Sequence, residues 1–184
     1  VFEKNTYKLL GAQIVGHDGV DKRIDVLATA IRAGMKASDL KELDLAYAPP
    51  YSAAKDPVNM AGFMIDNIET GVLKQWHIDD ADKLPRDGSV TLLDTRTVRE
   101  YQRGHIDGFY NIPVDELRER LNEIDPSKPV YVICQSGLRS YISCRILEGN
   151  GYTAYNFAGG YRFYEAVMND RALVKRATAC GMDD

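Results

Sequence analysis

Short apolar runs alternate with helical patterns along the second half of the chain. Three mainly apolar runs are of strand length, at residues 90–94, 130–134 and 153–157. Apolar residues recur at helical spacing between and after them, at residues 98–103, 115–121, 140–149 and 161–168. Continuous apolar strands that alternate with helices predict an α/β fold, with a mainly parallel sheet flanked by helices.

The first half of the chain gives a weaker pattern. Residues 7–15 (YKLLGAQIV) are rich in β-prone residues and predict a strand, and residues 20–33 predict a helix followed by Gly34. A second helix is predicted from Asp56, a suitable N-cap, and Pro57, which suits the first helical position. Gly71 should end this helix.

One strand and a few helices make an incomplete domain. We therefore expect residues 1–74 to be the C-terminal fragment of a larger α+β unit, and the start at Val1 rather than Met agrees with a fragment. Residues 75–89 are polar and contain Pro85 and Gly88, so they are predicted to be a linker. Residues 90–184 should form the α/β domain.

Composition narrows the classes of function. A net charge of −4 argues against nucleic acid as a partner, and no apolar run reaches the roughly 20 residues that cross a bilayer. Three cysteines without C-x-x-C spacing indicate free thiols in a reducing compartment, which we take to be the cytoplasm. The three histidines are too scattered to predict a metal site.

Residues 129–140 (PVYVICQSGLRS) place Cys134 where an apolar strand meets a glycine-containing loop and a helix. Ligand sites of open α/β sheets lie at the carboxyl ends of strands. Backbone N–H groups and the helix dipole converge there, and both favour a thiolate over a thiol. Gly137 permits a positive φ, and Arg139 adds a permanent cation. Cys134 is thus a candidate nucleophile, although it could also be an ordinary buried core cysteine.

Charged residues upstream of Cys134 suit structural support better than catalysis. Asp94, Arg96 and Glu100 are expected to form an ion-pair network that holds Arg139. Thr97 and Glu100 also have the spacing of a capping box. Two other thiols lie later in the chain: Cys144, expected in the core, and Cys180, expected as a surface thiol in a tail.

The second half of the chain resembles single-domain rhodaneses. The motif C-x-x-G-x-R-S beginning at Cys134 is similar to their active-site loop. Further matches to the family signature are LDTR at 93–96, EY at 100–101, GHIDG at 104–108, NIP at 111–113 and the glycine pair at 159–160. Phe109 departs from the family, which usually has a small residue there, and should alter packing rather than chemistry.

This resemblance implies a sulfurtransferase. Cys134 would accept a sulfane sulfur as a persulfide and pass it to a thiol or another acceptor, with Arg139 as a second catalytic residue. Thiosulfate, polysulfide and coenzyme A persulfide are the expected partners. His105 would have a structural role. The implied substrate-binding loop comprises Gln135, Ser136, Gly137, Leu138, Arg139 and Ser140.

The first half has its own resemblance. LDLAYAPPYS at 43–52 and KDPVN at 55–59 are similar to the end of the dimerisation domain of coenzyme A-disulfide reductases and related flavoproteins. The resemblance implies a homodimeric parent enzyme that uses FAD, NAD(P)H and coenzyme A. It also implies that Tyr47 reaches the redox cysteine of the partner subunit, although Tyr47 could be only a packing residue at a proline-rich turn. No G-x-G-x-x-G motif occurs, so this chain alone should bind no flavin.

The sequence therefore favours a sulfurtransferase domain within the C-terminal part of an FAD- and NAD(P)H-dependent coenzyme A-disulfide, persulfide or polysulfide reductase. Three alternatives remain: an inactive binding or regulatory module, a structural appendage of the reductase, and a phosphatase-like anion-binding domain. Tyrosine-phosphatase-like loops place the arginine six positions after the cysteine. Arg139 is the fifth residue after Cys134, which argues against the phosphatase.

Overall fold

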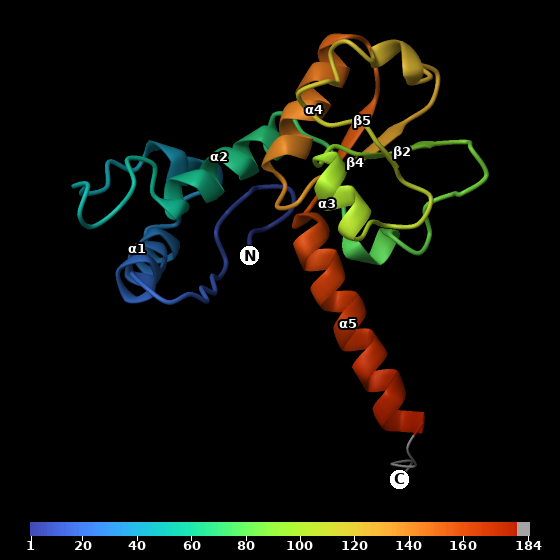
Figure 1. The fold of residues 1–184 in the computed structure, drawn as a ribbon. Helices are drawn as coiled ribbons and strands as arrows, with labels where there is room; N and C mark the ends of the chain where they lie inside the picture. Colours follow the sequence, from blue (N-terminus) through green and yellow to red (C-terminus); the bar gives the residue numbers. More distant parts are fainter. Residues whose placement is uncertain (180–184) are drawn as a thin grey trace. The chain divides into compact units, whose positions relative to one another are not determined.

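The computed structural model describes residues 1–179, and these divide into two units. The first unit is Val1–Val72, and the second begins at Leu73. In Figure 1 the first unit is drawn from blue to teal and the second from green to red.

The second unit is built on a five-stranded sheet with the order β1-β5-β4-β2-β3. All of its neighbouring strands run parallel. The prediction of an α/β fold with a mainly parallel sheet is thus confirmed. The strands are β1 (Gln75–Trp76), β2 (Thr91–Asp94), β3 (Tyr110–Asn111), β4 (Val130–Ile133) and β5 (Ala154–Phe157).

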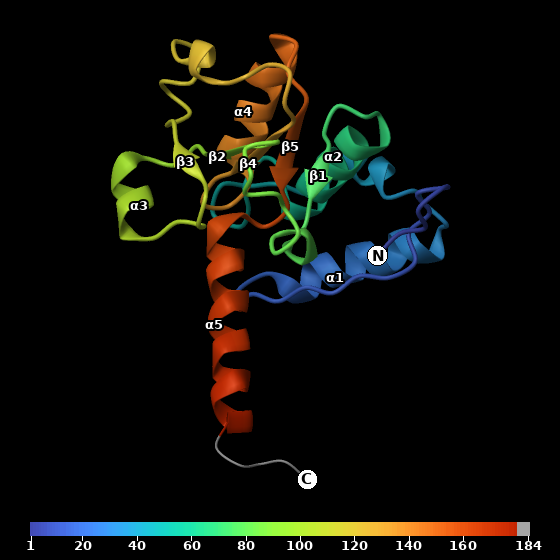
Figure 2. The same cartoon turned by 90° about the vertical axis from the view of Figure 1, so that its right-hand side faces the viewer.

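Helices of the second unit connect these strands, and one helix follows the last strand. They are α3 (Val98–Arg103), α4 (Leu138–Gly149) and α5 (Gly160–Ala179), with the short 3-10 helices η2 (Ile78–Asp80) and η3 (Leu121–Glu123). The capping box of α3 forms as predicted. Helix α5 continues well beyond its predicted end at residue 168, and Figures 1 and 2 show it extending away from the sheet.

Both faces of the sheet are buried, which explains why most residues of its strands are apolar. On one face, Leu93 and Val132 pack in a cluster with Cys144 and Leu147 of α4. On the opposite face, the core cluster comprises Trp76, Ala81, Leu84, Leu92, Ile106, Phe109, Ile133 and Phe157.

The predicted linker at residues 75–89 is instead part of the second unit. Strand β1 pairs with β5 at the edge of the sheet, and Trp76 is only 2% exposed. Its indole Nε1 donates to the Val132 carbonyl at 3.3 Å, and Leu84 is buried in the same core. A two-residue strand is too short to show a periodic pattern. Because polar residues surround Trp76 and Leu84, the sequence did not indicate that these two side chains are buried.

The helix predicted at residues 115–121 is also wrong. Successive turns replace it, with hydrogen bonds from the Leu117 amide to the Val114 carbonyl and from the Arg120 amide to the Leu117 carbonyl. These bonds span three residues rather than the four of an α-helix. Leu117 is fully buried, so one apolar anchor produced the helical pattern.

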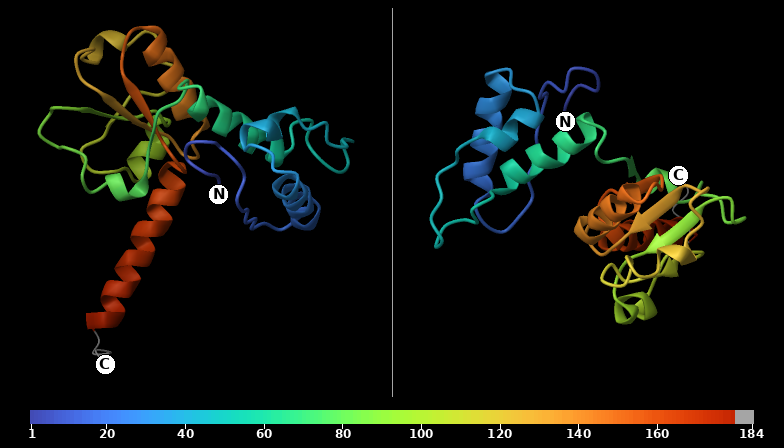
Figure 3. Two further views of the ribbon diagram at one scale, coloured as in Figure 1. Left: turned by 180° about the vertical axis from the view of Figure 1, so that it is seen from behind. Right: turned by 90° about the horizontal axis from the view of Figure 1, so that it is seen from above.

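The first unit contains α1 (Val20–Arg32), the 3-10 helix η1 (Ser38–Glu42) and α2 (Pro57–Glu69). Figure 3 shows it as helices joined by loops. The predicted N-cap of α2 is confirmed, since the Asp56 carboxylate accepts from the Val58 amide at 3.0 Å. Burial raises the pKa of Asp56, but hydrogen bonds from Arg23 and Val58 outweigh that effect and lower it.

The strand predicted at residues 7–15 does not form. Only isolated β-bridges occur here, from Lys8 to Lys36 and from Leu9 to Phe2. A strand needs a neighbouring strand for its backbone hydrogen bonds, and the described residues of this unit supply single bridges instead. Tyr7 has a φ of 58°, which also interrupts the extended backbone.

Each helix within residues 1–179 is too short or too polar to cross a membrane.

Candidate active site

Cys134 lies directly after β4 and is fully buried. Its Sγ atom accepts a hydrogen bond from the Gly137 amide at 3.1 Å and one from the Ser140 hydroxyl at 3.2 Å. Gly137 is the N-cap of α4 and has a φ of 108°, as the sequence predicted for this loop. The sulfur is therefore placed at the positive end of a twelve-residue helix, among donors that stabilise negative charge.

Helix α5 fixes the loop from the other side. The Tyr161 amide donates to the Cys134 carbonyl at 2.7 Å, and the Arg162 amide donates to the Gln135 carbonyl at 3.2 Å. Gly160 makes this approach possible, because a Cβ atom there would lie 2.6 Å from the Gln135 backbone. The glycine pair at 159–160 thus allows α5 to begin against the loop.

Arg139 forms a bidentate ion pair with Glu100. Nη1 and Nη2 of Arg139 each lie 2.7 Å from a Glu100 carboxylate oxygen. The hydrogen bond from Arg139, followed by those from Thr97, lowers the pKa of Glu100 to about 2 despite partial burial. The Glu100 carboxylate, with a smaller contribution from the Cys134 sulfur, raises the pKa of Arg139. Glu100 therefore holds the Arg139 guanidinium in place. Thr97 in turn donates hydrogen bonds to the Glu100 carboxylate at the start of α3.

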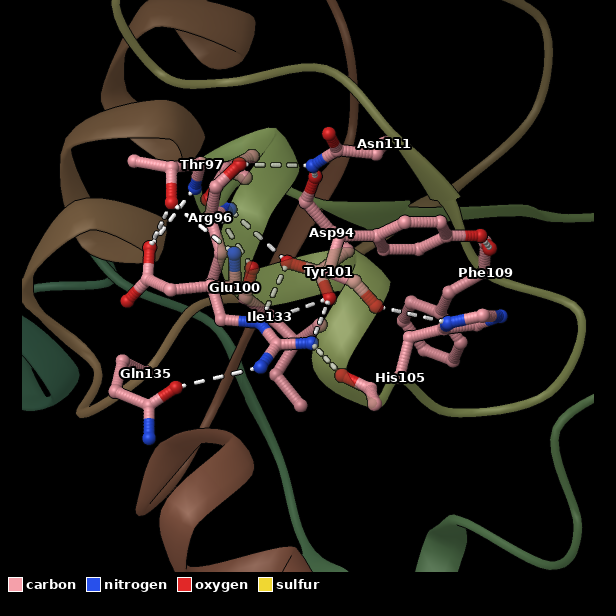
Figure 4. Close-up of polar contacts among 12 residues, drawn as sticks. Asp94, Arg96, Thr97, Glu100, Tyr101, His105, Phe109, Asn111, Ile133 and Gln135 are labelled. Carbon is pink, nitrogen blue, oxygen red and sulfur yellow. Dashed lines mark hydrogen bonds and ion pairs between the residues drawn. The ribbon is translucent and has the colours of Figure 1, made fainter.

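A second ion pair is completely buried beneath the loop. Arg96 and Asp94 are 2% and 0% exposed, and Arg96 Nη2 lies 2.7 Å from Asp94 Oδ2. Figure 4 shows the Arg96 guanidinium between Asp94 and Gln135. Arg96 Nη1 donates to Gln135 Oε1 at 3.3 Å. The side-chain Nδ2 of Asn111 donates to the carbonyls of Asp94 and Arg96, both at 2.8 Å. The many partners of this buried pair fix both side chains in one geometry, an arrangement that suits the predicted supporting role.

Two groups complete the surroundings of Arg96. Its Nη2 donates to the Gly104 carbonyl at 2.7 Å, and its guanidinium lies 3.9 Å from the Tyr161 ring centroid. An open cavity of about 370 Å³ lies beside this network. Its lining residues are Arg96, Glu100, Arg103, Gly104, Gln135, Tyr161 and Glu165.

The remaining predicted residues lie away from this chemistry. Burial raises the pKa of the Cys144 thiol, which sits in the core as expected. Cys180 lies outside the described residues. The His105 ring stacks on Tyr101 at 3.9 Å, and its Nδ1 atom lies 3.1 Å from the Tyr101 carbonyl, an arrangement that suits a structural role. Phe109 is buried against Trp76, with their ring centroids 6.0 Å apart.

Tyr47 belongs to the first unit, and its side chain is 53% exposed. The structure thus brings Cys134, its loop, Arg139 and Glu100 together within the second unit. The role predicted for Tyr47 concerns a partner subunit and stays a prediction.

Sequence reasoning missed two residues of the site. Asn156 is buried on β5, and its side-chain Nδ2 donates to the Gly137 carbonyl at 3.4 Å. Tyr161 contributes both its backbone amide and its ring. A polar residue near the carboxyl end of an apolar strand was the available signal for Asn156.

Comparison with known families agrees with this geometry. Residues 77–166 match the rhodanese-like domain, and residues 1–57 match the pyridine nucleotide-disulphide oxidoreductase dimerisation domain. The chain joins a rhodanese-like domain to part of an oxidoreductase dimerisation domain. The rhodanese-like match begins inside the predicted linker, in agreement with the position of β1 in the sheet.

Two individual proteins each match more than a third of the chain. An uncharacterized protein of Bacillus subtilis, YqhL, is 44% identical over 72 residues, which are 39% of this chain and 57% of that protein. Coenzyme A disulfide reductase of Staphylococcus epidermidis is 50% identical over 62 residues, which are 34% of this chain and 14% of the reductase.

Two solved structures resemble most of the chain. Reduced Bacillus anthracis CoADR-RHD is 45% identical with a TM-score of 0.79, covering 84% of this chain and 28% of that one. A NAD-dependent persulfide reductase from A. fulgidus is 40% identical with a TM-score of 0.74, covering 89% of this chain and 29% of that one. The chain thus spans less than a third of the length of these two proteins.

Proposed function

We propose that the rhodanese-like domain is a sulfurtransferase in which Cys134 carries sulfane sulfur as a persulfide. The observation that carries this proposal is the pair of hydrogen bonds that the Gly137 amide and the Ser140 hydroxyl donate to Cys134 Sγ. Preorganised donors of this kind stabilise a thiolate before the reaction and the anionic persulfide after it.

The transfer has two balanced steps. The Cys134 thiolate attacks the sulfane sulfur of a donor such as thiosulfate, forming a sulfur–sulfur bond while the donor bond breaks and its electron pair leaves with sulfite. An acceptor thiolate then attacks the terminal sulfur of the Cys134 persulfide. This second attack forms a new persulfide on the acceptor and restores the Cys134 thiolate.

The arginine of the loop disfavours the phosphatase alternative. Arg139 follows Cys134 by five positions and is held by Glu100 through two short hydrogen bonds. Arginine recognises phosphate best through a bidentate contact, and Glu100 occupies that fork. The loop suits a single sulfur atom better than a tetrahedral phosphate.

For the parent protein, we propose an FAD- and NAD(P)H-dependent reductase of coenzyme A disulfide, persulfide or polysulfide, assembled as a homodimer. Support comes from the matched dimerisation domain and from relatives named coenzyme A disulfide reductase and NAD-dependent persulfide reductase. The dinucleotide sites of such an enzyme would lie outside this chain, which lacks a G-x-G-x-x-G motif.

Replacement of Cys134 tests the proposed activity. Cys134→Ser should lower sulfur transfer from thiosulfate to cyanide by at least about 10³-fold, because the nucleophile is lost. Cys144→Ala and Cys180→Ser are the controls and should keep most of the activity. Unchanged turnover in Cys134→Ser would refute the proposal, and Cys134-dependent hydrolysis of an aryl phosphate would favour the phosphatase.

A further inference from the structure

Two arginines beside the Cys134 loop are already paired with carboxylates. Both terminal nitrogens of Arg139 lie 2.7 Å from Glu100 oxygens. Arg96 is bound by Asp94 in the same bidentate manner, with Nε at 3.1 and 3.0 Å and Nη2 at 2.7 Å. Each of these two guanidinium charges is therefore neutralised by a carboxylate in direct contact with it.

The neighbouring cavity repeats this balance. Arg103 and Glu165 line it together with Arg96 and Glu100, so each sign contributes two of these four side chains. With Arg139 and Asp94 added, these six side chains are three cations and three carboxylates, so they carry no excess positive charge among them.

Backbone and hydroxyl donors then remain to attract an anion. They are the Gly137 amide, the Ser140 hydroxyl and the N-terminal end of α4, which carries roughly half a unit of positive charge. Such a site suits a donor with one negative charge. A second negative charge on the same donor would meet the Glu100 carboxylate, because the Arg139 guanidinium is already paired with it.

We propose that Glu100 is a specificity-determining residue, which selects sulfane-sulfur donors with one negative charge over donors with two by holding Arg139 in a bidentate ion pair. The inference rests on the proposed sulfurtransferase function. Glu100 acts through Arg139 and is thus a positioning residue. Because the pKa of Glu100 is lowered to about 2, its carboxylate stays ionised at the pH of ordinary assays.

Two small donors isolate the effect of charge. Thiosulfate carries two negative charges, and methanethiosulfonate carries one because a methyl group replaces an oxygen. Both donate the same sulfur: a bond forms to Cys134 Sγ, and the electron pair of the broken bond leaves with sulfite or with methanesulfinate.

The Glu100→Gln variant removes the charge with little change of shape. Glutamine can replace glutamate in a capping box, so the start of α3 should persist. Glu123→Gln is the matched control, because it removes the same charge from the exposed Arg120–Glu123 ion pair elsewhere in the unit. Glu100→Asp keeps the charge and should keep a selectivity close to that of the unchanged protein.

Binding is measured first in Cys134→Ser, which cannot transfer sulfur. Adding Glu100→Gln should tighten thiosulfate binding on the order of tenfold and methanethiosulfonate binding by no more than about threefold, because a partly screened charge acts twice on the dianion. Glu123→Gln should change neither. In the protein that retains Cys134, Glu100→Gln should lower KM for thiosulfate and leave kcat nearly unchanged.

An unchanged ratio of the two affinities, or equal weakening of both, would overturn the inference and make Glu100 a support for Arg139 only. If Glu100→Gln does not fold, the Arg139→Gln variant tests the inference instead. It leaves the Glu100 carboxylate unpaired, so it must weaken thiosulfate binding more than methanethiosulfonate binding. An inactive protein with intact charge selectivity would count against the proposed function and not against this inference.

Discussion

Gly160 faces the backbone of the active-site loop at a distance that leaves no room for a side chain. It has a φ of 70°, and a Cβ atom there would lie 2.6 Å from the Gln135 carbonyl carbon and the Ser136 amide nitrogen. The sequence predicted the importance of the glycine pair only through family resemblance. The contact depends on how α5 meets the loop, which no local pattern encodes.

Gly160→Ala should therefore destabilise the second unit by about 2–4 kcal/mol and lower sulfur transfer, since both the backbone and the loop must shift. Gly151→Ala is a matched control with a φ of 86° and no atom within 4 Å of its Cβ, so it should cost only about 1 kcal/mol. Urea unfolding followed by the fluorescence of Trp76, the single tryptophan, measures both. Equal losses in the two variants would contradict this account of the loop.

Elements that carry their own end signals were predictable from the sequence. Asp56 with Pro57, and Thr97 with Glu100, mark the starts of α2 and α3 and form the expected caps. Elements defined by distant partners were not. Strand β1 exists only because β5 lies beside it, and the predicted strand at residues 7–15 lacks such a neighbour.

The residues of the site that lie close together in the sequence could also be predicted. Cys134 and Arg139 could be found because both belong to one short strand–loop–helix segment. The pairing of Arg139 with Glu100 joins residues 39 positions apart and could be expected only in outline. Asn156 reaches the loop from a strand that follows later in the chain.

At the scale of elements, β1 should be required for folding of the rhodanese-like domain. A chain that starts at residue 73 should unfold cooperatively, whereas one that starts at residue 90 lacks Trp76 and Leu84. Loss of the buried tryptophan alone costs about 3–5 kcal/mol, a large part of the 5–15 kcal/mol typical of a domain. Circular dichroism during heating compares the two chains, and equal melting temperatures would restore residues 75–89 as a linker.

We expect the rhodanese-like domain and the dimerisation-domain part to cooperate in sulfur chemistry within the parent enzyme. Fusion in one chain raises the effective concentration of one site at the other. Cys134→Ala in the intact parent should lower NADH-dependent sulfide release from polysulfide, while reduction of coenzyme A disulfide continues. If both reactions keep their full rates, the rhodanese-like domain is a structural appendage.

Tyr47→Phe complements that experiment in the first unit. A phenol can donate a proton to a leaving thiolate, so its loss should slow disulfide or persulfide reduction by the parent. Sulfur transfer by the rhodanese-like domain should be unaffected, because Tyr47 lies outside that unit. A parent enzyme with unchanged reduction rates would identify Tyr47 as a packing residue.

If Cys134 carries sulfur, the mass of the protein should increase after exposure to polysulfide. We predict a gain of one sulfur atom on the peptide that contains Cys134, removed by cyanide and absent from Cys134→Ser. Cys144, whose thiol pKa is raised by its burial in the core, should remain unmodified. A gain of sulfur that persists in Cys134→Ser, or an unmodified Cys134 in the folded protein, would contradict the account.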